Sequence, residues 1–497
     1  MADDLKILLE MRPALAGHAG IPQATRLLFQ GLGTLPGMTV EGLLQSSNRV
    51  VNKGLPVDPR QRLADHRRID RLSRVLISLQ QSERPSRVER VVDALRLSKQ
   101  MVSALVSRAV GGRQALTRFD ATGFEDFIWR QLFARTLDVE DLEAVTRAGY
   151  RIARMPWSGM HRMGLLTRRF GGAVYPVLDT AGFDVLIAQT PCPARVSGGT
   201  RLVVNYHDAI PLMMPHTISD KAYHQASHYH ALKRNVADGA WFTCVSEATR
   251  RDLITIFPEA EPRAVTIHNM LSSHYRRADD GQERVAEILR TREHANLASA
   301  RPPRDGPGGP VEYLLMVSTL EPRKNHLGLL AAWERLRSQG HANLRLVFVG
   351  SLGWHHDDIL QKLKPWLSRG GLHLLEDVPA DELRLLYRYA RLTVCPSFGE
   401  GFDFSGVEAM RCGGVVAASD IPVHRDIFGA ASHYFSPYSS PQMAQALADL
   451  LGSEAGPRRE QLRAEGERVA ANYLPERILP QWDRFLARLR DPSSPTT

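Results

Sequence analysis

Five short apolar runs between residues 311 and 419 constrain the fold of this chain more than any other feature of its sequence. They read "VEYLLMVST", "LRLVFVGS", "GLHLLED", "RLTVCPS" and "GGVVAAS", and each is followed by a turn or a helical stretch. Strands that are apolar on both faces and are spaced by helices are typical of a parallel sheet covered on both sides. The second half of the chain is therefore predicted to be an α/β domain.

The same alternation occurs in the first half, interrupted by a segment of another kind. "LKILLEM" near the start is one short β-rich run, and "FDVLIAQ", "RLVVNYHD", "GAWFTCVS" and "RAVTIHNM" follow from Phe183 onward. Between them, residues 45–170 show mainly helical spacing of their apolar side chains. The prediction is a second α/β domain over residues 1–280, with a helical insertion at about 45–170.

A segment rich in proline and glycine separates the two predicted domains. Residues 301–310 read "RPPRDGPGGP", which can form neither a helix nor a central strand. We therefore place a linker at residues 281–311, the second domain at residues 312–475, and a C-terminal helix and tail at residues 476–497. A chain of 497 residues is long enough for two such domains.

Positive charge is concentrated in the insertion. The chain has a net charge of +9, and residues 58–118 contain 14 basic against 6 acidic side chains. Such a surface suits an anionic partner (nucleic acid, anionic lipid or a phosphorylated substrate), or it is a solvated helical surface rich in arginine. We find neither aromatic residues interleaved with the basic ones nor a helix-turn-helix pattern, so nucleic acid is not expected as a partner.

Nothing in the sequence indicates secretion or a membrane span. The start, "MADDLKILLE", has acidic residues where a secretory signal has basic ones, and no run of about 18 apolar residues occurs. The four cysteines, Cys192, Cys244, Cys395 and Cys412, show neither metal-ligand spacing nor a disulfide pattern. We expect a cytoplasmic protein without a dedicated metal site.

The strongest candidate site is "CPSFGEGFDFSGVEAM", which runs from a predicted strand through a glycine loop into a helix. Ligands of open α/β sheets bind at this end of the strands. Glu400 lies in the loop and Glu408 about one turn into the helix, and ionised carboxylates accept paired hydrogen bonds from the vicinal hydroxyls of a sugar. The alternative for Glu408 is a capping box with Ser405, in which it only caps the helix.

The rest of this loop favours a ligand. Gly401 and Gly406 permit close approach of a ligand to the backbone, and the amides around Ser405 and Gly406 are placed to meet phosphate oxygens. Phe402 lies within the same loop. We therefore count these residues, with Glu408, as donor-binding candidates.

Basic residues follow the first strand of the second domain. In "STLEPRKNHLGLL", Arg323 and Lys324 precede a helix that begins near Asn325. Cations at such a place can neutralise a diphosphate together with the helix N-terminus, although an exposed basic turn gives the same pattern. The next strand ends at Gly350, which offers backbone groups near the expected nucleobase.

Two segments of the first domain complete the set. His207 closes the run "RLVVNYH" and would face the cleft between the domains, unless it is only a hydrogen-bonded strand-end residue. Gly17 and Gly20 lie in a glycine loop after the first strand that lacks the spacing G-x-G-x-x-G. This loop is a candidate to cradle a phosphate or the acceptor.

Taken together, these segments resemble the GT-B retaining glycosyltransferases of family four. The resemblance is close over residues 313–440 and fair over residues 183–270, and the E-x7-E pair is Glu400 and Glu408. It implies two Rossmann-like domains that face a cleft, with a C-terminal tail that crosses back to the N-terminal domain.

The resemblance also implies roles. Glu400 would hold the hydroxyls of the transferred hexose, and Glu408 the ribose of the nucleotide. Lys324, supported by Arg323, would bind the diphosphate without a metal ion, and His207 would lie beside the transferred sugar. Retention would follow from attack by the acceptor on the face from which the diphosphate leaves.

One departure from the family pattern concerns the donor. The loop reads "FDFSG" instead of the frequent "FGLP", so Asp403 stands where glycine is usual. A carboxylate near a diphosphate would repel it, unless the side chain faces the sugar or the acceptor.

The pieces "TLEPRKN" and "SDIPVHRD" are similar to those of bacterial mannosyltransferases that build surface polysaccharide. This similarity implies a nucleotide sugar as donor, GDP-mannose first and UDP-hexose second, and a saccharide or lipid-linked saccharide as acceptor. The alternative is a GT-B protein that transfers nothing, such as an epimerase or an inactive scaffold.

The stretch "PWSGMHRMGLLTRRFGG", residues 156–172, is both amphipathic and cationic. Segments of this kind can lie on an anionic membrane surface, at the inner face of the plasma membrane. The alternative is a helical cap that packs on the N-terminal domain.

Overall fold

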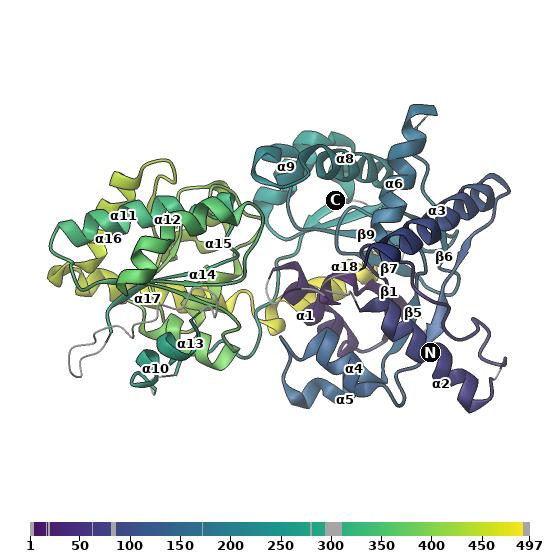
Figure 1. Cartoon of the computed structure of the whole chain (residues 1–497), viewed down its shortest axis with the longest axis horizontal. Coiled ribbons are helices and arrows are strands. Elements are labelled where there is room, and N and C mark those ends of the chain that lie inside the picture. The colour runs from purple at the N-terminus through teal and green to yellow at the C-terminus, as the bar shows by residue number, and fades with distance from the viewer. Residues whose placement is uncertain are drawn as a thin grey trace.

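The computed structural model describes residues 4–490, apart from residues 16, 18, 19, 62, 81–85, 171, 279–280 and 294–310. Two sheets form two α/β domains that lie side by side along the longest axis of the molecule (Figure 1). The predicted architecture of two Rossmann-like domains is confirmed. Within the described part of the chain, no helix is long and apolar enough to cross a membrane.

The N-terminal domain is built on a sheet for which the described residues give eight strands, in the spatial order β11-β10-β9-β7-β1-β2-β5-β4. Neighbouring strands are parallel, except for β4, which is antiparallel to β5. The strands are β1 (Leu5–Glu10), β2 (Met38–Leu44), β4 (Thr117–Phe119), β5 (Gly149–Ile152), β7 (Val185–Ala188), β9 (Arg201–Tyr206), β10 (Trp241–Cys244) and β11 (Ala264–Thr266).

Helices and a small second sheet surround this one. The helices are α1 (Ile21–Gly33), α2 (Asp65–Leu79), α3 (Arg87–Ala109), α4 (Glu125–Ile128), α5 (Leu142–Arg147), α6 (Trp157–Thr167), α7 (Ile210–Met213), α8 (Lys221–Ala237) and α9 (Glu247–Ile256). The small sheet consists of β3 (Gln114–Ala115), β6 (Val177–Asp179) and β8 (Arg195–Val196).

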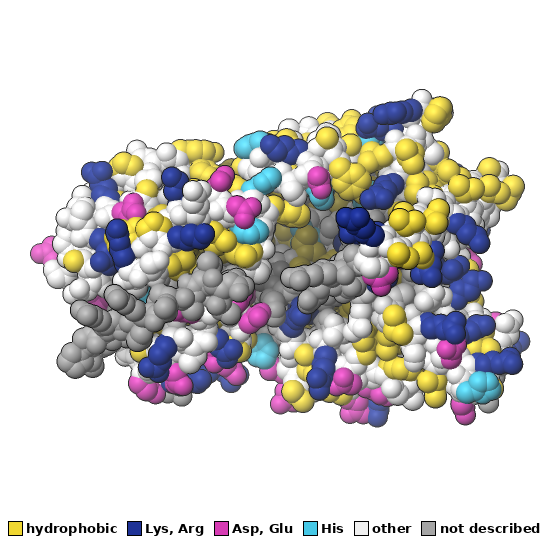
Figure 2. Space-filling model, viewed as in Figure 1, with side chains coloured by type: hydrophobic (Ala, Val, Ile, Leu, Met, Phe, Trp, Pro, Cys, Tyr) yellow, Lys and Arg dark blue, Asp and Glu magenta, His cyan; other side chains and the backbone are white. Residues whose placement is uncertain are grey.

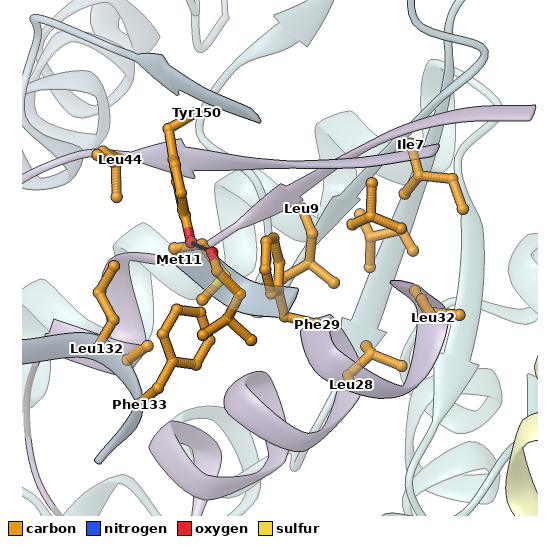
Figure 3. Close-up of a cluster of buried hydrophobic side chains, with 14 of the residues drawn as sticks. Ile7, Leu9, Met11, Leu28, Phe29, Leu32, Leu44, Leu132, Phe133 and Tyr150 are labelled. Carbon is orange, nitrogen blue, oxygen red and sulfur yellow. Dashed lines mark hydrogen bonds between the residues drawn. The ribbon is translucent and has the colours of Figure 1, made fainter. Parts of the chain in front are cut away.

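The core of this domain forms where α1 lies on β1. Leu28 and Leu32 of α1 face Ile7 and Leu9 of β1 in one buried cluster (Figure 3). The helix presents an apolar side chain every three to four residues, and the strand every second residue, so the two faces interlock. This packing fixes the position of the loop between β1 and α1, which reaches the cleft.

The insertion predicted at about 45–170 is only partly helical, which corrects that expectation. α2 and α3 are long helices, but β4 and β5 from the same segment extend the main sheet at its edge. These strands have three and four residues, with polar side chains among them. Runs so short show no periodicity that could distinguish them from loops.

The C-terminal domain is built on a parallel sheet with the order β14-β13-β12-β15-β16-β17 among the described strands. In β12, Tyr313 and Leu315 enter one hydrophobic cluster, while Leu314 and Met316 enter another on the opposite face. Burial on both faces explains why these strands read as unbroken apolar runs. The strands are β12 (Tyr313–Val317), β13 (Arg345–Val349), β14 (Leu372–Leu375), β15 (Leu392–Cys395), β16 (Val416–Ser419) and β17 (Ser432–Phe435).

The segment predicted as a linker, residues 281–311, begins with a helix. Val285, Ile288 and Leu289 of α10 (Arg284–Thr291) are buried in the core of the C-terminal domain, and residues 294–310 lie outside the described part. The other helices of this domain are α11 (His326–Ser338), α12 (His356–Arg369), α13 (Ala380–Tyr389), α14 (Phe404–Arg411), α15 (Pro422–Phe428), α16 (Ser440–Leu451) and α17 (Gly456–Ala471).

The last helix, α18 (Pro475–Arg490), crosses back to the N-terminal domain (Figure 1). Its apolar side chains Ile478, Trp482 and Phe485 belong to the same buried cluster as β1 and α1. The ring of Phe485 meets that of Trp241 edge to face, with centroids 6.1 Å apart. Residues 491–497 of the predicted tail lie outside the described part.

Candidate active site

A cavity of about 480 Å³ lies between the two domains. The carboxyl ends of strands from both sheets open onto it, as the rule for open α/β sheets predicts. Of the twelve candidate residues, eleven line this cavity: Gly17, Gly20, His207, Arg323, Lys324, Gly350, Glu400, Gly401, Phe402, Ser405 and Glu408. The exception among the candidates is Gly406.

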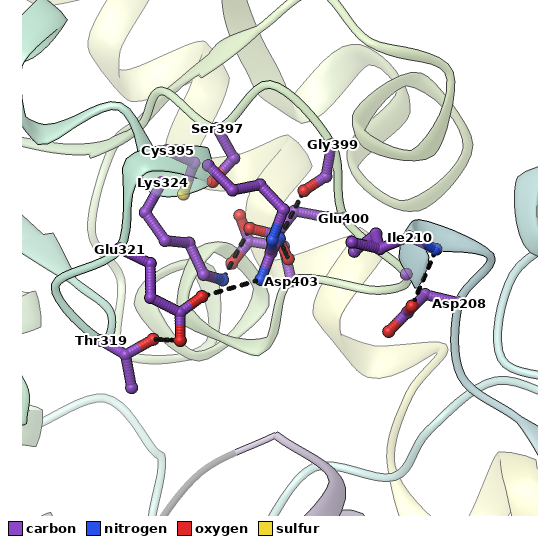
Figure 4. Close-up of polar contacts among 12 residues, drawn as sticks. Asp208, Ile210, Thr319, Glu321, Lys324, Cys395, Ser397, Gly399, Glu400 and Asp403 are labelled. Carbon is purple, nitrogen blue, oxygen red and sulfur yellow. Dashed lines mark hydrogen bonds and ion pairs between the residues drawn. The ribbon is translucent and has the colours of Figure 1, made fainter. Parts of the chain in front are cut away.

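Glu400 is buried between two cations (Figure 4). Its Oε1 accepts a hydrogen bond from Nζ of Lys324 at 2.6 Å, and its Oε2 lies 2.9 Å from a guanidinium nitrogen of Arg323. Burial opposes ionisation of Glu400, but the charges of Arg323 and Lys324 outweigh it and hold the pKa of the carboxyl below its usual range. The carboxylate is therefore ionised and pairs with both cations.

A short 3-10 helix (Pro322–Lys324) holds these cations in place. It ends at Asn325, whose left-handed backbone (φ 65°) starts α11 in a new direction. The side-chain amide of Asn325 donates to the carbonyl oxygens of Pro396 and Pro437, both at 3.0 Å. The loop after β12 is thereby fastened to the loop after β15, which carries Glu400.

Glu408 is buried in a different environment. Its Oε1 accepts from the side-chain amide of Gln23 in α1 at 2.9 Å, and its Oε2 accepts from the hydroxyl of Tyr387 at 3.0 Å. Burial raises the pKa of Glu408 to about 7, although these hydrogen bonds act in the opposite direction. The capping-box alternative is wrong, because Asp403 is the N-cap residue of α14 and no side chain caps it.

Asp403 adopts a left-handed backbone (φ 64°) and turns its carboxylate into the protein. One oxygen accepts from the hydroxyl of Ser405 at 2.6 Å, and the other lies 3.0 Å from Nε2 of the fully buried His424. Burial opposes ionisation, but the contact with His424 lowers the pKa of Asp403 well below its usual range. Both oxygens of the carboxylate are thus engaged within the protein, by Ser405 and His424.

The glycines of the loop serve packing within the protein. A Cβ on Gly401 would lie 1.9 Å from the carbonyl oxygen of His207, and one on Gly406 would lie 2.3 Å from the ring of Phe428. Gly401 therefore permits the two domains to approach, and Gly406 permits α15 to pack on α14. The side chain of Phe402 packs against the rings of Phe404 and Tyr473, with centroids 5.1 and 5.2 Å away.

His207 follows β9 and is neutral, since burial lowers its pKa to about 3. Its Nε2 lies 3.3 Å from Oε1 of Gln189, which also accepts from Nδ2 of Asn205 at 3.1 Å. Nε2 also lies 3.4 Å from Nδ2 of Asn205, so it can donate to Gln189 or accept from Asn205, depending on the tautomer. In either tautomer the neutral ring has one nitrogen that donates and one that accepts, and it cannot act as a cation.

On the side of the cavity formed by the N-terminal domain, a buried arginine of α1 anchors the loop between β1 and α1. Arg26 of α1 is fully buried and donates to the carbonyl oxygens of Ala14 and Gly17, at 2.8 and 2.9 Å. Gly17 and Gly20 have left-handed φ values of 71° and 72° and line the cavity. Residues 16, 18 and 19 of this loop lie outside the described part.

Gln23, Tyr387 and His424 are not among the residues predicted from the sequence. Gln23 and Glu408 are 385 residues apart in the chain, and nothing near Gln23 marks it as a partner. His424 lies within the recognised piece "SDIPVHRD" but was given no role. Among the described residues, no three His, Cys, Asp or Glu side chains are grouped so as to hold a metal ion.

Two Rossmann-like domains that face a cleft define the GT-B class of fold. Sucrose-phosphate synthase from Thermosynechococcus elongatus is similar with a TM-score of 0.55 at 13% identity, over 98% of this chain and 99% of that one. Anabaena HepE in complex with UDP gives a TM-score of 0.54 at 12% identity, over 97% of this chain and all of that one. The fold of the protein is GT-B.

Residues 304–469 match the family described as Glycosyl transferases group 1, so the C-terminal half contains a domain of that family. The chain is 28% identical to the O-antigen chain mannosyltransferase B of Escherichia coli over 257 residues, which are 50% of this chain and 62% of that protein. It is 24% identical to the serotype-specific mannosyltransferase WbdA of Escherichia coli over 251 residues, 29% of that protein. The chain thus spans less than two thirds of the length of these relatives.

Proposed function

We propose that the protein is a retaining glycosyltransferase that moves a hexose, with mannose the best candidate, from a nucleoside diphosphate sugar to a saccharide or lipid-linked saccharide in cell-surface polysaccharide synthesis. The observation that carries this proposal is the cavity that places Glu400 and its two cations beside Glu408 and His207. GDP-mannose is preferred as donor over UDP-hexose because the similar proteins are named as mannosyltransferases.

In the proposed binding mode, the donor diphosphate replaces Glu400 as the partner of Arg323 and Lys324. Both cations already converge on the two oxygens of one carboxylate, and phosphate oxygens can take the same hydrogen bonds. The exchange would free the carboxylate of Glu400 to accept hydrogen bonds from the hexose hydroxyls. Glu408, on the other side of the loop, would accept from the ribose.

In the proposed reaction, the bond between the anomeric carbon and the diphosphate oxygen breaks. The hydroxyl oxygen of the acceptor bonds to the same carbon from the same face, and its proton passes to the departing diphosphate. Arg323 and Lys324 stabilise the charge that develops on that diphosphate. We propose that no metal ion is needed for this step, so that a chelator such as EDTA should leave the rate unchanged.

Titration calorimetry with GDP and with UDP, followed by transfer assays with GDP-mannose and with UDP-hexoses, tests the proposal. We expect GDP to bind and mannose to be transferred with retained configuration. Binding of UDP without binding of GDP would indicate that the donor is a UDP-hexose and not GDP-mannose. Release of an epimerised sugar nucleotide would identify an epimerase. A folded protein that binds neither nucleotide and transfers nothing would be the inactive scaffold.

We also propose that the protein works at the inner face of the plasma membrane, as a peripheral protein of the cytoplasm, where a lipid-linked acceptor would be found. The segment from which the sequence predicted this contact packs mainly on the N-terminal domain. Met160 and Met163 of α6 are buried there, whereas Leu166 and Phe170 are exposed next to Arg168 and Arg169. Of helix α6, only the C-terminal end is thus exposed and able to contact a membrane.

A further inference from the structure

Helix α3 has a second apolar face that nothing in the described structure covers. Its side chains Val88, Val91, Leu95, Val102, Val106 and Val110 (the last at the C-cap) have exposed fractions between 59% and 77%. Isolated exposed valines are common on protein surfaces, but a contiguous stripe along one helix indicates an interaction site. We call these six residues the α3 stripe.

The stripe lies opposite the side on which α3 packs. Leu97 and Ala104 are buried, and each follows a stripe residue, Leu95 or Val102, by two positions. Two positions correspond to a rotation of about 200° around a helix axis. Because Leu97 faces Gly159 of α6, the stripe points away from the domain. The stripe therefore does not contribute to the hydrophobic core of the domain.

The charges around the stripe favour an anionic partner. α3 contains two acidic residues, and both are engaged within the protein: Glu89 in a capping box with Ser86, and Asp93 with Arg49 at 3.0 Å. Its basic residues are Arg87, Arg90, Arg96, Lys99 and Arg108. Apolar side chains flanked by cations are the composition of helices that lie in the surface of an anionic bilayer.

A second copy of the chain fits the stripe less well. Lys99 lies four positions after Leu95 and three before Val102, so it stands within the stripe near its middle. Two copies paired along α3 would bring these lysines and the neighbouring arginines together, where like charges repel. On a bilayer, the long side chain of lysine can reach the headgroups while the valines are buried.

We propose that the α3 stripe docks the N-terminal domain on an anionic lipid bilayer. The exposed end of α6 supplies a second contact, because α3 packs along α6 and Leu166 and Phe170 are 60% and 90% exposed beside Arg168 and Arg169. Figure 2 shows hydrophobic and basic side chains intermixed over this part of the domain, away from the C-terminal domain. The inference rests on the proposed location at the membrane, but on neither the donor nor the reaction.

Flotation of the purified full chain with lipid vesicles tests the docking. Vesicles of phosphatidylcholine with roughly one third phosphatidylglycerol are compared with pure phosphatidylcholine at low salt. We expect the protein to float with the anionic vesicles only. The double substitution Leu95→Glu with Val102→Glu should lower its partition coefficient about tenfold or more, since it places carboxylates against an anionic surface.

Val139→Glu is the matched control, because Val139 is 73% exposed in the same domain but outside the stripe; it should float like the wild type. Thermal unfolding and nucleotide calorimetry show that the variants keep their fold and their donor site. Failure of the wild type to float would overturn the docking, whatever nucleotide it binds, and so would flotation that the double substitution leaves unchanged. A dimer in sedimentation velocity that the double substitution abolishes would assign the stripe to a second copy instead.

Discussion

The two glutamates of the candidate site are eight positions apart and both buried, yet their surroundings are opposite. Glu400 contacts two cations, Arg323 and Lys324, within 3 Å. Glu408 contacts neutral donors instead, Gln23 and Tyr387 at nearly the same distances and Tyr275 as a third. The pKa of the first carboxyl is held below its usual range, whereas that of the second is raised to about 7.

The difference shows that burial alone does not decide the charge of a carboxyl, because the cations overcome it at Glu400 and the neutral donors do not overcome it at Glu408. Burial alone would favour the neutral acid in both. At the Glu400 end, Arg323 and Lys324 keep the carboxyl ionised, and the phosphates of a donor could take its place beside these cations. At the Glu408 end, the carboxyl holds a proton at pH values below about 7, and it must lose this proton before both oxygens can accept hydrogen bonds, as the proposed ribose contact requires. In the proposed binding mode, anions are therefore exchanged at one end of the cavity and a proton is lost at the other.

The largest effect is expected where the diphosphate would be neutralised. Lys324→Ala should lower kcat of transfer about a hundredfold, because a preorganised cation is lost where charge develops on the leaving group. Steady-state kinetics with the donor identified by calorimetry measure this loss. Lys364→Ala, which removes an exposed lysine from α12, is the control and should leave kcat unchanged. If both variants turn over at the wild-type rate, Lys324 does not bind the diphosphate.

Glu400→Gln separates the two proposed actions of this residue. We expect kcat to fall tenfold or more, since the hexose loses an ionised acceptor, while GDP or UDP binds several-fold more tightly. The tighter binding follows because Arg323 and Lys324 no longer have a competing anion. Calorimetry and kinetics on the same preparation give both quantities, with the exposed Glu454→Gln as control. Weaker nucleotide binding would show that Glu400 does not compete with the diphosphate.

Glu408 should make binding and stability depend on pH in opposite directions. Its folded-state pKa is raised from 4.5 to about 7, so the native state holds a proton that the unfolded chain has released between these values. The free energy of unfolding should therefore fall as the pH rises through this range. Nucleotide affinity should rise, about tenfold between roughly pH 6 and pH 8, because the ribose needs the ionised acceptor.

Glu408→Gln provides the check on this pH dependence. The substitution should flatten both pH profiles and weaken nucleotide binding above neutral pH. Calorimetry and thermal unfolding across the range measure the two slopes. An affinity that stays pH-dependent in Glu408→Gln would assign the titration to another group.

The fold and the position of the site could be predicted from local sequence, because both depend on short-range patterns. The strands of the C-terminal sheet are buried on both faces and read as unbroken apolar runs, and ligand residues follow such strands. Short strands near the edge of the sheet lack this signal: β5 has only four residues, of which Arg151 is charged, and its sequence predicts part of a helical insertion instead.

The contacts of Glu408 could not be predicted, because no local pattern encodes them. The spacing from Ser405 to Glu408 fits a capping box equally well, and the left-handed backbone of Asp403 decides against it. Burial raises the pKa of Glu408, and the hydrogen bond that opposes this shift comes from Gln23 of α1, at the other end of the chain. Such properties come from tertiary structure, and the sequence shows only that a carboxyl is present.

The smallest effect tests the contact by which the N-terminal domain sets the charge of Glu408. The amide of Gln23 favours the ionised carboxylate, so Gln23→Met should move the midpoint of the pH-dependent nucleotide affinity upward from about 7 and weaken binding less than tenfold at neutral pH. Gln30→Met is the matched control, because Gln30 lies in the same helix and also donates to a carboxylate, Asp141 at 2.9 Å, away from the cavity. A midpoint that both substitutions leave in place would show that Gln23 contacts Glu408 without tuning its pKa, and that the cations beside Glu400 alone separate the two glutamates.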